Sequence, residues 1–379
     1  MNLVVILAFL APSSSIGYAI QACITLYICI TSAKRSHYNI NFIRIIFVII
    51  GVSYFLLSLL TGVIGQGVFE LKSTLILVNI CIMVAVFPFN LRINLSDYTF
   101  LLVISSIVLS QLLYALKVEP VYGWIDLFYI RDDLNPRTYQ ENLGIEQISW
   151  IRFGGIFGNP NQCAKALTLA FAAFCLIAKS KSNLIISALI CFIGIVLTGS
   201  RTGLGVFSII LAFLFYKSNI RPYFKIYTSL IFSIFLGYIV TLSKRLRFFD
   251  LNSLYLSFSE KYALIGRYID TVARDRPLEL LIGSGHIERY EFNYGDLRLQ
   301  AFDAESGYML QAFGLIGIVA MLSFYISNIA MLTGRKRIFG VNLLWLASST
   351  IMLNARFSLL YMLLFSCIYY SQRPIQSRD

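Results

Sequence analysis

The sequence predicts an all-α polytopic membrane protein, a bundle of about 11 transmembrane helices with two long polar loops on its outer side. Of its 379 residues, 58% are hydrophobic and 13% are charged, whereas an ordinary soluble domain carries about 25% charged residues. Many apolar runs approach the roughly 20 residues that a membrane-spanning helix needs. Strand-like alternation of the β-barrel kind does not occur. This composition predicts a helix bundle in lipid.

The apolar runs and polar loops divide the chain into five segments. These are N-terminal transmembrane helices over 1–116, a first outer loop over 117–160, central transmembrane helices over 161–242, a large outer loop over 243–305 and C-terminal transmembrane helices over 306–379. Spans are expected at about 3–30, 45–63, 71–87, 100–116, 161–178, 184–197, 204–216, 226–242, 308–332, 343–353 and 359–370. The first run is broken at Pro12, which predicts either one kinked helix or a short re-entrant piece followed by a span.

Basic residues are distributed unevenly between the two sides of the predicted bundle. If the loop holding Lys34 and Arg35 is placed inside and the spans alternate, every acidic residue except Asp97 and Asp379 falls outside. The further basic residues that fall inside are Arg92, Lys179, Lys181, Lys217, Arg221, Lys225, Arg335, Lys336, Arg337, Arg373 and Arg378. This is the positive-inside pattern of membrane proteins, and it puts both long loops and Arg201 on the outer side.

Charge and cysteine usage argue against several other classes of protein. The net charge of +12 lies largely in short loops beside apolar spans and forms no solvated basic patch, so nucleic acid is not an expected partner. All seven cysteines lie in or at the edge of apolar spans, so neither a disulfide framework nor a metal-ligand spacing is predicted. No metal or other cofactor is expected, and no charged segment precedes the first apolar run as in a cleaved signal peptide.

A glycine-rich turn, LTGSRTGLG at residues 197–205, places a fixed charge between two long apolar runs. Gly199 and Gly203 permit a sharp turn and a close approach of the backbone to a ligand, and Ser200 adds a hydroxyl. The turn opens onto a new helix, whose N–H groups attract anions. Two interpretations of Arg201 are open: an interfacial anchor, or an anion-binding donor, which the small neighbours favour.

Another glycine-rich stretch, RFGGIFGNPN at residues 152–161, comes first in chain order and leads into the span expected at 161–178. Pro160 suits the first position of a helix and Asn159 suits its N-cap. In that helix Asn161 and Lys165 share one face by their i, i+4 spacing. Lys165 lies inside an apolar span, where a cation should face a cavity or a partner; the alternative is a side chain that extends to the outer boundary.

The large outer loop ends in polar residues that lead into the next span. Arg267 follows a glycine, His286 follows a Gly-Ser-Gly run, and Glu305 enters a long apolar span from the outer side. Glu305 has two interpretations: a partly desolvated general base, or a charge that stabilises a helix N-terminus. Arg356, at the outer end of the penultimate span, is expected to be an interfacial anchor.

Four basic residues, Arg152, Lys165, Arg201 and Arg267, lie on the predicted outer side close to glycine-rich turns. Guanidinium groups bind phosphate bidentately and keep their charge when partly buried. The predicted ligand is therefore a di-anion at the membrane surface, such as a lipid pyrophosphate. The predicted chemistry is stabilisation of the leaving group by arginines in place of magnesium, since the acidic pair Asp132–Asp133 lies far from these turns in sequence.

These stretches resemble the motifs of the O-antigen polymerase and ligase family. The resemblance lies in GIFGNPN at 155–161, LTGSRTG at 197–203, their order on the outer side, and the large outer loop near the C-terminus. Through topology the resemblance extends over most of the chain, while its specific motifs occupy only these short stretches.

The resemblance implies a GT-C-like glycosyltransferase of the bacterial inner membrane with its active site facing the periplasm. Such an enzyme, as a polymerase of O-antigen, capsule or exopolysaccharide repeats, transfers the growing glycan between undecaprenyl-pyrophosphate-linked repeats. The expected partners are these lipid-linked oligosaccharides, membrane lipids, and a chain-length regulator and flippase of the same pathway. The predicted catalytic residues are Arg201 and Glu305, and the predicted residues that bind pyrophosphate or glycan are Arg152, Asn159, Asn161, Lys165, Ser200, Arg267 and His286.

Two alternatives to the polymerase stay open, an O-antigen ligase and a flippase or transporter of lipid-linked oligosaccharides. The ligase branch usually has a histidine just before the span after the large loop, where this chain has Asp303, Ala304 and Glu305. This departure favours the polymerase and makes Glu305 the candidate base, with His286 second. A flippase should show inverted repeats and charges through the membrane midplane, whereas the charges here gather at the outer boundary.

Overall fold

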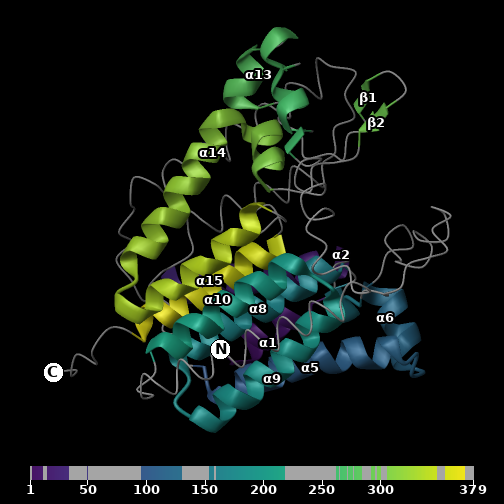
Figure 1. The fold of residues 1–379 in the computed structure, drawn as a ribbon, viewed down its shortest axis with the longest axis vertical. Coiled ribbons are helices and arrows are strands. Elements are labelled where there is room, and N and C mark those ends of the chain that lie inside the picture. Colours follow the sequence, from purple (N-terminus) through teal and green to yellow (C-terminus); the bar gives the residue numbers. More distant parts are fainter. Residues whose placement is uncertain are drawn as a thin grey trace.

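The computed structural model describes residues 2–11, 15–33, 49, 95–129, 153–157, 159–217, 262–263, 265–270, 272–275, 277–283, 292–294, 297–299, 305–347 and 355–371. These residues are helical apart from a short hairpin and connecting turns (Figure 1). Within the described part of the chain, three helices are long and apolar enough to span a membrane: α5 (Asp97–Ala115), α8 (Pro160–Ile177) and α9 (Lys181–Thr198). The prediction of a helical membrane protein is thereby confirmed. Apart from residue 49, the spans predicted over 45–63, 71–87 and 226–242 lie outside the described residues.

Helix α8 forms the centre of the bundle. Every residue from Cys163 to Cys175 is buried, and many of them are small, which lets neighbouring helices approach closely. The elements packed against it are α5, α9, α10 (Arg201–Lys217), α15 (Ala355–Tyr370) and a 3₁₀ helix, η4 (Gly334–Ala347). A side chain on α8 between Cys163 and Cys175 is therefore surrounded by protein.

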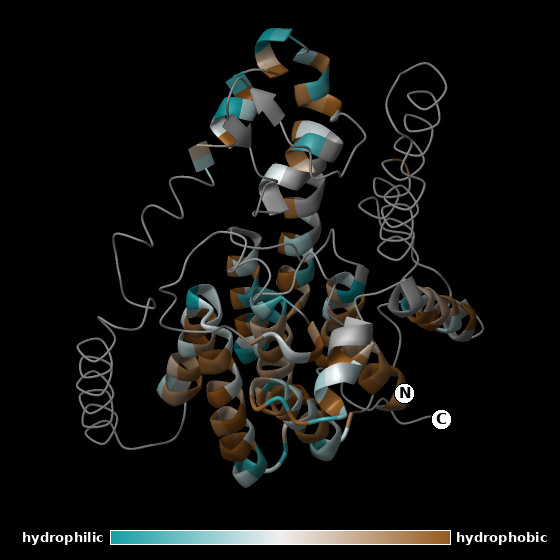
Figure 2. Ribbon diagram, turned by 90° about the vertical axis from the view of Figure 1, so that its right-hand side faces the viewer, coloured by the Kyte–Doolittle hydropathy of each residue, from teal (hydrophilic) through white to brown (hydrophobic). Residues whose placement is uncertain are grey.

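The outer faces of the bundle are apolar, as lipid requires. On α9 the exposed residues Ile185, Leu189 and Ile193 repeat every four positions and therefore form one stripe. On α14 (Glu305–Met331) Val319 and Ile326 are likewise exposed. Figure 2 shows hydrophobic colouring along the helices of the bundle and hydrophilic colouring near their ends. Large apolar side chains exposed in this pattern indicate a lipid-facing surface.

The first apolar run consists of two helices. Helix α1 (Asn2–Leu10) and α2 (Ser15–Ala33) are separated at the predicted break, so the run is not one kinked helix. Helix α1 packs against α5 and α15, and its Phe9 is fully buried. The N-terminal run therefore closes the bundle against its last helix.

The C-terminal part differs from the prediction in one respect. A span was expected over 343–353, but the chain forms the 3₁₀ helix η4 from Gly334 to Ala347, and residues 348–354 lie outside the described part. The helix begins among three consecutive basic residues, which hydropathy assigns to a loop; their side chains bond backbone carbonyls at one end of the bundle. Helix α15 likewise begins at Ala355, before the predicted start, and so includes Arg356.

Part of the large loop packs onto α14 as a small cap. Tyr268 and Val272 of the loop form a buried cluster with Leu310 of α14. Helix α13 (Pro277–Ile282) crosses α14 at Gly314, where φ is 65° and a Cβ would collide with the backbone of Leu281. A two-stranded antiparallel hairpin, β1 (Phe292–Tyr294) and β2 (Leu297–Leu299), belongs to the same loop. The first loop begins with helix α6 (Val121–Tyr129).

Candidate functional site

The first glycine-rich stretch leads into the N-terminus of α8 as its sequence predicts. Asn159 is the N-cap, with φ −87° and ψ 124°, and Pro160 is the first helical residue. The Asn159 Oδ1 accepts hydrogen bonds from the backbone N–H groups of Asn161, at 2.9 Å, and Gln162, at 3.4 Å. The predicted cap is confirmed, and this oxygen of Asn159 stabilises the helix.

The turn before that cap is bound to the end of α9. Phe153 donates its backbone N–H to the carbonyl of Leu197 at 3.0 Å. The amide of Gln111, from α5, donates to the carbonyl oxygens of Phe153 at 2.9 Å and Gly194 at 3.2 Å. At Gly155 φ is 53°, and a Cβ there would lie 2.6 Å from the Ser110 Oγ. Glycine is therefore required at position 155, both by the backbone conformation and because there is no room for a Cβ.

The second glycine-rich stretch forms the turn between α9 and α10. Gly199 ends α9 in the left-handed conformation, with φ 58° and ψ 23°. Ser200 is buried, and its Oγ accepts a hydrogen bond from the Gly203 N–H at 3.2 Å. Helix α10 then begins at Arg201, as predicted. The Ser200 hydroxyl therefore caps α10. This is a structural role in addition to the binding role predicted for Ser200.

The two motifs, 42 residues apart from Asn159 to Arg201, meet at one end of the bundle. A Cβ at Gly203 would lie 2.7 Å from the Cβ of Ala164, so the first turns of α10 and α8 are in close contact. The hydrogen bond between Phe153 and Leu197 joins the turns that precede these helices. The N-termini of two parallel helices therefore lie side by side, with Arg201 at the first position of one of them.

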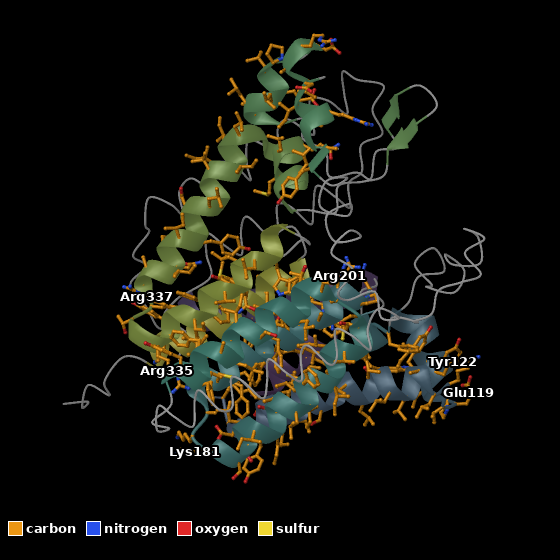
Figure 3. All side chains as sticks on the ribbon, viewed as in Figure 1. Glu119, Tyr122, Lys181, Arg201, Arg335 and Arg337 are labelled. Atoms are coloured by element: carbon orange, nitrogen blue, oxygen red, sulfur yellow. The ribbon has the colours of Figure 1, made fainter. Side chains whose placement is uncertain are left out.

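Arg201 lies at the opposite end of the bundle from a group of basic residues. Figure 3 shows Arg201, Glu119 and Tyr122 at one end, and Lys181, Arg335 and Arg337 at the other. Arg201 is half-buried there. This separation agrees with the sidedness predicted from the charge pattern.

The basic end is held by hydrogen bonds from charged side chains to helix termini. The Arg335 Nη2 donates to the carbonyl of Cys175 at 2.6 Å, at the C-terminus of α8. The Lys336 Nζ donates to the Ser371 Oγ at 2.7 Å, beside the C-terminus of α15. Asp97, the acidic exception on this side, accepts from the backbone N–H groups of Lys179 and Ser180 at 3.1 and 2.9 Å. Arg335, Lys336 and Asp97 thus each bond backbone C=O or N–H groups near a helix end, where such groups lack a partner within the helix.

Lys165 is fully buried, one turn into α8. Its Nζ lies 4.4 Å from the ring centroid of Phe357 and 5.9 Å from that of Trp345. The Trp345 Nε1 donates to the Thr168 Oγ1 at 3.0 Å, one turn further along the same face. The ammonium therefore lies inside the bundle beside two aromatic rings, and the alternative of a side chain extending to the boundary is wrong.

Arg356 is a buried cation that the sequence analysis did not assign to the site. It was expected to be an interfacial anchor, but only 2% of it is exposed. Its guanidinium lies 3.8 Å from the ring centroid of Phe157, in the first motif, and donates to the carbonyl of Phe9. The signal that could have found it is Asn354 before Ala355, a typical helix N-cap, which would place Arg356 inside the last helix.

The remaining predicted residues are not brought together with the motifs by the described contacts. Arg267 is exposed, next to the buried Tyr268 of the cap. Glu305 is the first residue of α14, a helix that packs against α13 and η4. Arg152 and His286 lie outside the described residues. Of the nine predicted site residues, Asn159, Asn161, Lys165, Ser200 and Arg201 gather at the N-termini of α8 and α10.

Neither a protein-family model nor a curated protein sequence matches this chain. Within the described ranges, no group of three or more His, Cys, Asp or Glu side chains lies together. The arrangement combines the positive ends of two helix dipoles with the guanidinium of Arg201. Such a combination attracts and orients an anion.

Proposed function

We propose that this protein is a glycosyltransferase that polymerises oligosaccharide repeats carried on undecaprenyl pyrophosphate. It would act in the bacterial inner membrane, with the end of the bundle that holds Arg201 facing the periplasm. The observation that carries the proposal is the meeting of the two glycine-rich motifs through Gly203 and Ala164. Their resemblance to the O-antigen polymerase and ligase family supplies the substrate class.

In the proposed reaction a hydroxyl oxygen of the acceptor repeat attacks the anomeric carbon of the donor glycan. The bond from that carbon to the pyrophosphate oxygen breaks, and undecaprenyl pyrophosphate leaves with the electron pair. Arg201 stabilises the charge that develops on this leaving group, with Arg152 and Arg267 as further candidates. Loss of one such preorganised donor typically slows a reaction about 10²–10³-fold.

Glu305 is the proposed acceptor of the proton that the attacking hydroxyl loses. Glu305 is the first residue of α14, where the large loop ends and the helix begins. Glu305→Gln keeps the shape of the side chain but cannot take the proton, so we expect chain extension to be lost while the protein still inserts in the membrane. Extension at the wild-type rate by this variant would remove Glu305 from the mechanism.

A deletion strain of the source organism distinguishes the proposed polymerase from its alternatives. Loss of a polymerase leaves single repeats attached to the cell surface, which a silver-stained gel of the surface glycan detects. Loss of a ligase instead leaves long glycan on the carrier lipid, and loss of a flippase leaves carrier-linked repeats facing the cytoplasm. Either of these two outcomes would refute the polymerase.

A further inference from the structure

The buried charged side chains of the described residues are Lys165 and Arg356, and aromatic rings connect them. The Arg356 guanidinium lies over the ring of Phe157 at 3.8 Å. That ring stacks on the ring of Phe357, with centroids 6.1 Å apart and an interplanar angle of 25°. The Lys165 Nζ also lies close to Phe357, at 4.4 Å from the centroid of its ring. We call these four side chains, Arg356, Phe157, Phe357 and Lys165, the cation–aromatic row.

The row links three parts of the chain that are far apart in sequence. Phe157 belongs to the turn that carries the first motif, Lys165 to α8, and Arg356 and Phe357 to α15. Arg356 also donates to the carbonyl of Phe9 in α1. Both cations lie within the distance at which a ring face attracts a cation, and the attraction is stronger where water is excluded. The last helix therefore holds the turn that precedes α8.

We propose that Arg356 is a positioning residue for the anion-binding end of the bundle. By fixing Phe157, it sets the direction in which the chain passes through Asn159 into α8, and so the aim of that helix N-terminus toward the ligand. The assignment of a ligand to this end rests on the proposed function. The geometric claim is that Arg356 acts on this turn through the Phe157 ring, and this claim does not depend on the proposed function.

Hydrogen–deuterium exchange of the purified full-length protein in detergent tests the geometric claim. We expect Phe157→Leu and Arg356→Lys each to speed amide exchange of peptides covering residues 153–163 by about tenfold. Lysine keeps the charge but lacks the planar group that lies flat on a ring, so it does not replace arginine here. Because both changes remove the contact between the Arg356 guanidinium and the Phe157 ring, their combined effect on exchange should be smaller than the sum of the two single effects.

Arg335→Lys is the matched control at the other end of α8. Arg335 also donates to a backbone carbonyl, that of Cys175, so this variant should speed exchange near residues 174–180 and leave 153–163 unchanged. Unchanged exchange at 153–163 in both Phe157→Leu and Arg356→Lys would overturn the inference. Fully additive effects of the two changes would do the same, since they would mean that Arg356 does not act through the ring.

A kinetic measurement separates a positioning role from a general loss of stability. With lipid-linked repeats as substrate, Arg356→Lys should raise the KM for the donor by about tenfold and leave kcat within a factor of about two, because misaligned N–H groups weaken anion binding. Arg335→Lys should change neither. Fast exchange at 153–163 with unchanged KM would refute the positioning role. If the wild-type protein extends no chains, the proposed function fails, and the exchange data still decide whether Arg356 holds the turn.

Discussion

Gly203→Ala is expected to separate the two motifs by pushing α10 away from α8. The added Cβ would lie 2.7 Å from the Cβ of Ala164, whereas carbon atoms in contact are about 3.5–4.0 Å apart. Neither methyl group can rotate away, because each is attached directly to a helix backbone. The helices must therefore move apart by about 1 Å at the end that holds Arg201.

The expected cost is moderate for stability and larger for activity. Overpacking of this kind typically destabilises a protein by about 1–3 kcal/mol, and a misplacement of about 1 Å in an active site can cost about 10²-fold in rate. Thermal unfolding in detergent measures the first effect, and extension of lipid-linked repeats measures the second. Adding Ala164→Gly to Gly203→Ala removes the opposing methyl group, so the exchanged pair should recover most of both losses.

Gly205→Ala is the matched control for helix propensity. It lies in the same helix, and a Cβ there meets nothing within 4 Å. Alanine is favoured over glycine in a helix by about 1 kcal/mol, so this variant should be neutral or slightly more stable. If Gly203→Ala behaves like Gly205→Ala, the close contact between α8 and α10 is not what brings the motifs together.

Two further changes test how the site is supported. Asp97→Ala removes the acceptor for the N–H groups of Lys179 and Ser180, so we expect a loss of about 1 kcal/mol in unfolding free energy; an unchanged midpoint of denaturant unfolding would contradict this. Gln111→Leu leaves the carbonyl of Phe153 without the amide that bonds it, and we expect about 1–3 kcal/mol of destabilisation with loss of chain extension. Full activity in this variant would show that the first turn does not depend on the Gln111 bond.

Local chemistry in the sequence was sufficient to predict the helix starts in the site. Proline after asparagine predicted the beginning of α8, and the small residues around Arg201 predicted a tight turn into α10. Charge alternation predicted that Arg201 and Arg335 lie at opposite ends. These features depend on neighbouring residues, and neighbouring residues are what a sequence displays directly.

Long-range packing decided what the sequence could not predict. An arginine before an apolar run is compatible with either an anchor at the surface or a buried cation. The position of the Phe157 ring, which the sequence does not show, makes Arg356 a buried cation. Lys165 posed the same choice, resolved by rings from α15 and η4. Arg267 was grouped with the motifs because of its charge and a neighbouring glycine, but packing of Tyr268 ties its segment to the cap on α14.

Chain extension by the purified protein, in liposomes that contain lipid-linked repeats and a chelator, tests the role of Arg201 most directly. We predict a ladder of longer glycans from the wild-type protein without divalent ions, the same ladder from Arg337→Ala, and single repeats only from Arg201→Ala. Arg337 is an exposed arginine at the opposite end of the bundle and serves as the matched control. A full ladder from Arg201→Ala, or strict dependence of the wild-type protein on a divalent ion, would contradict a site built on that guanidinium.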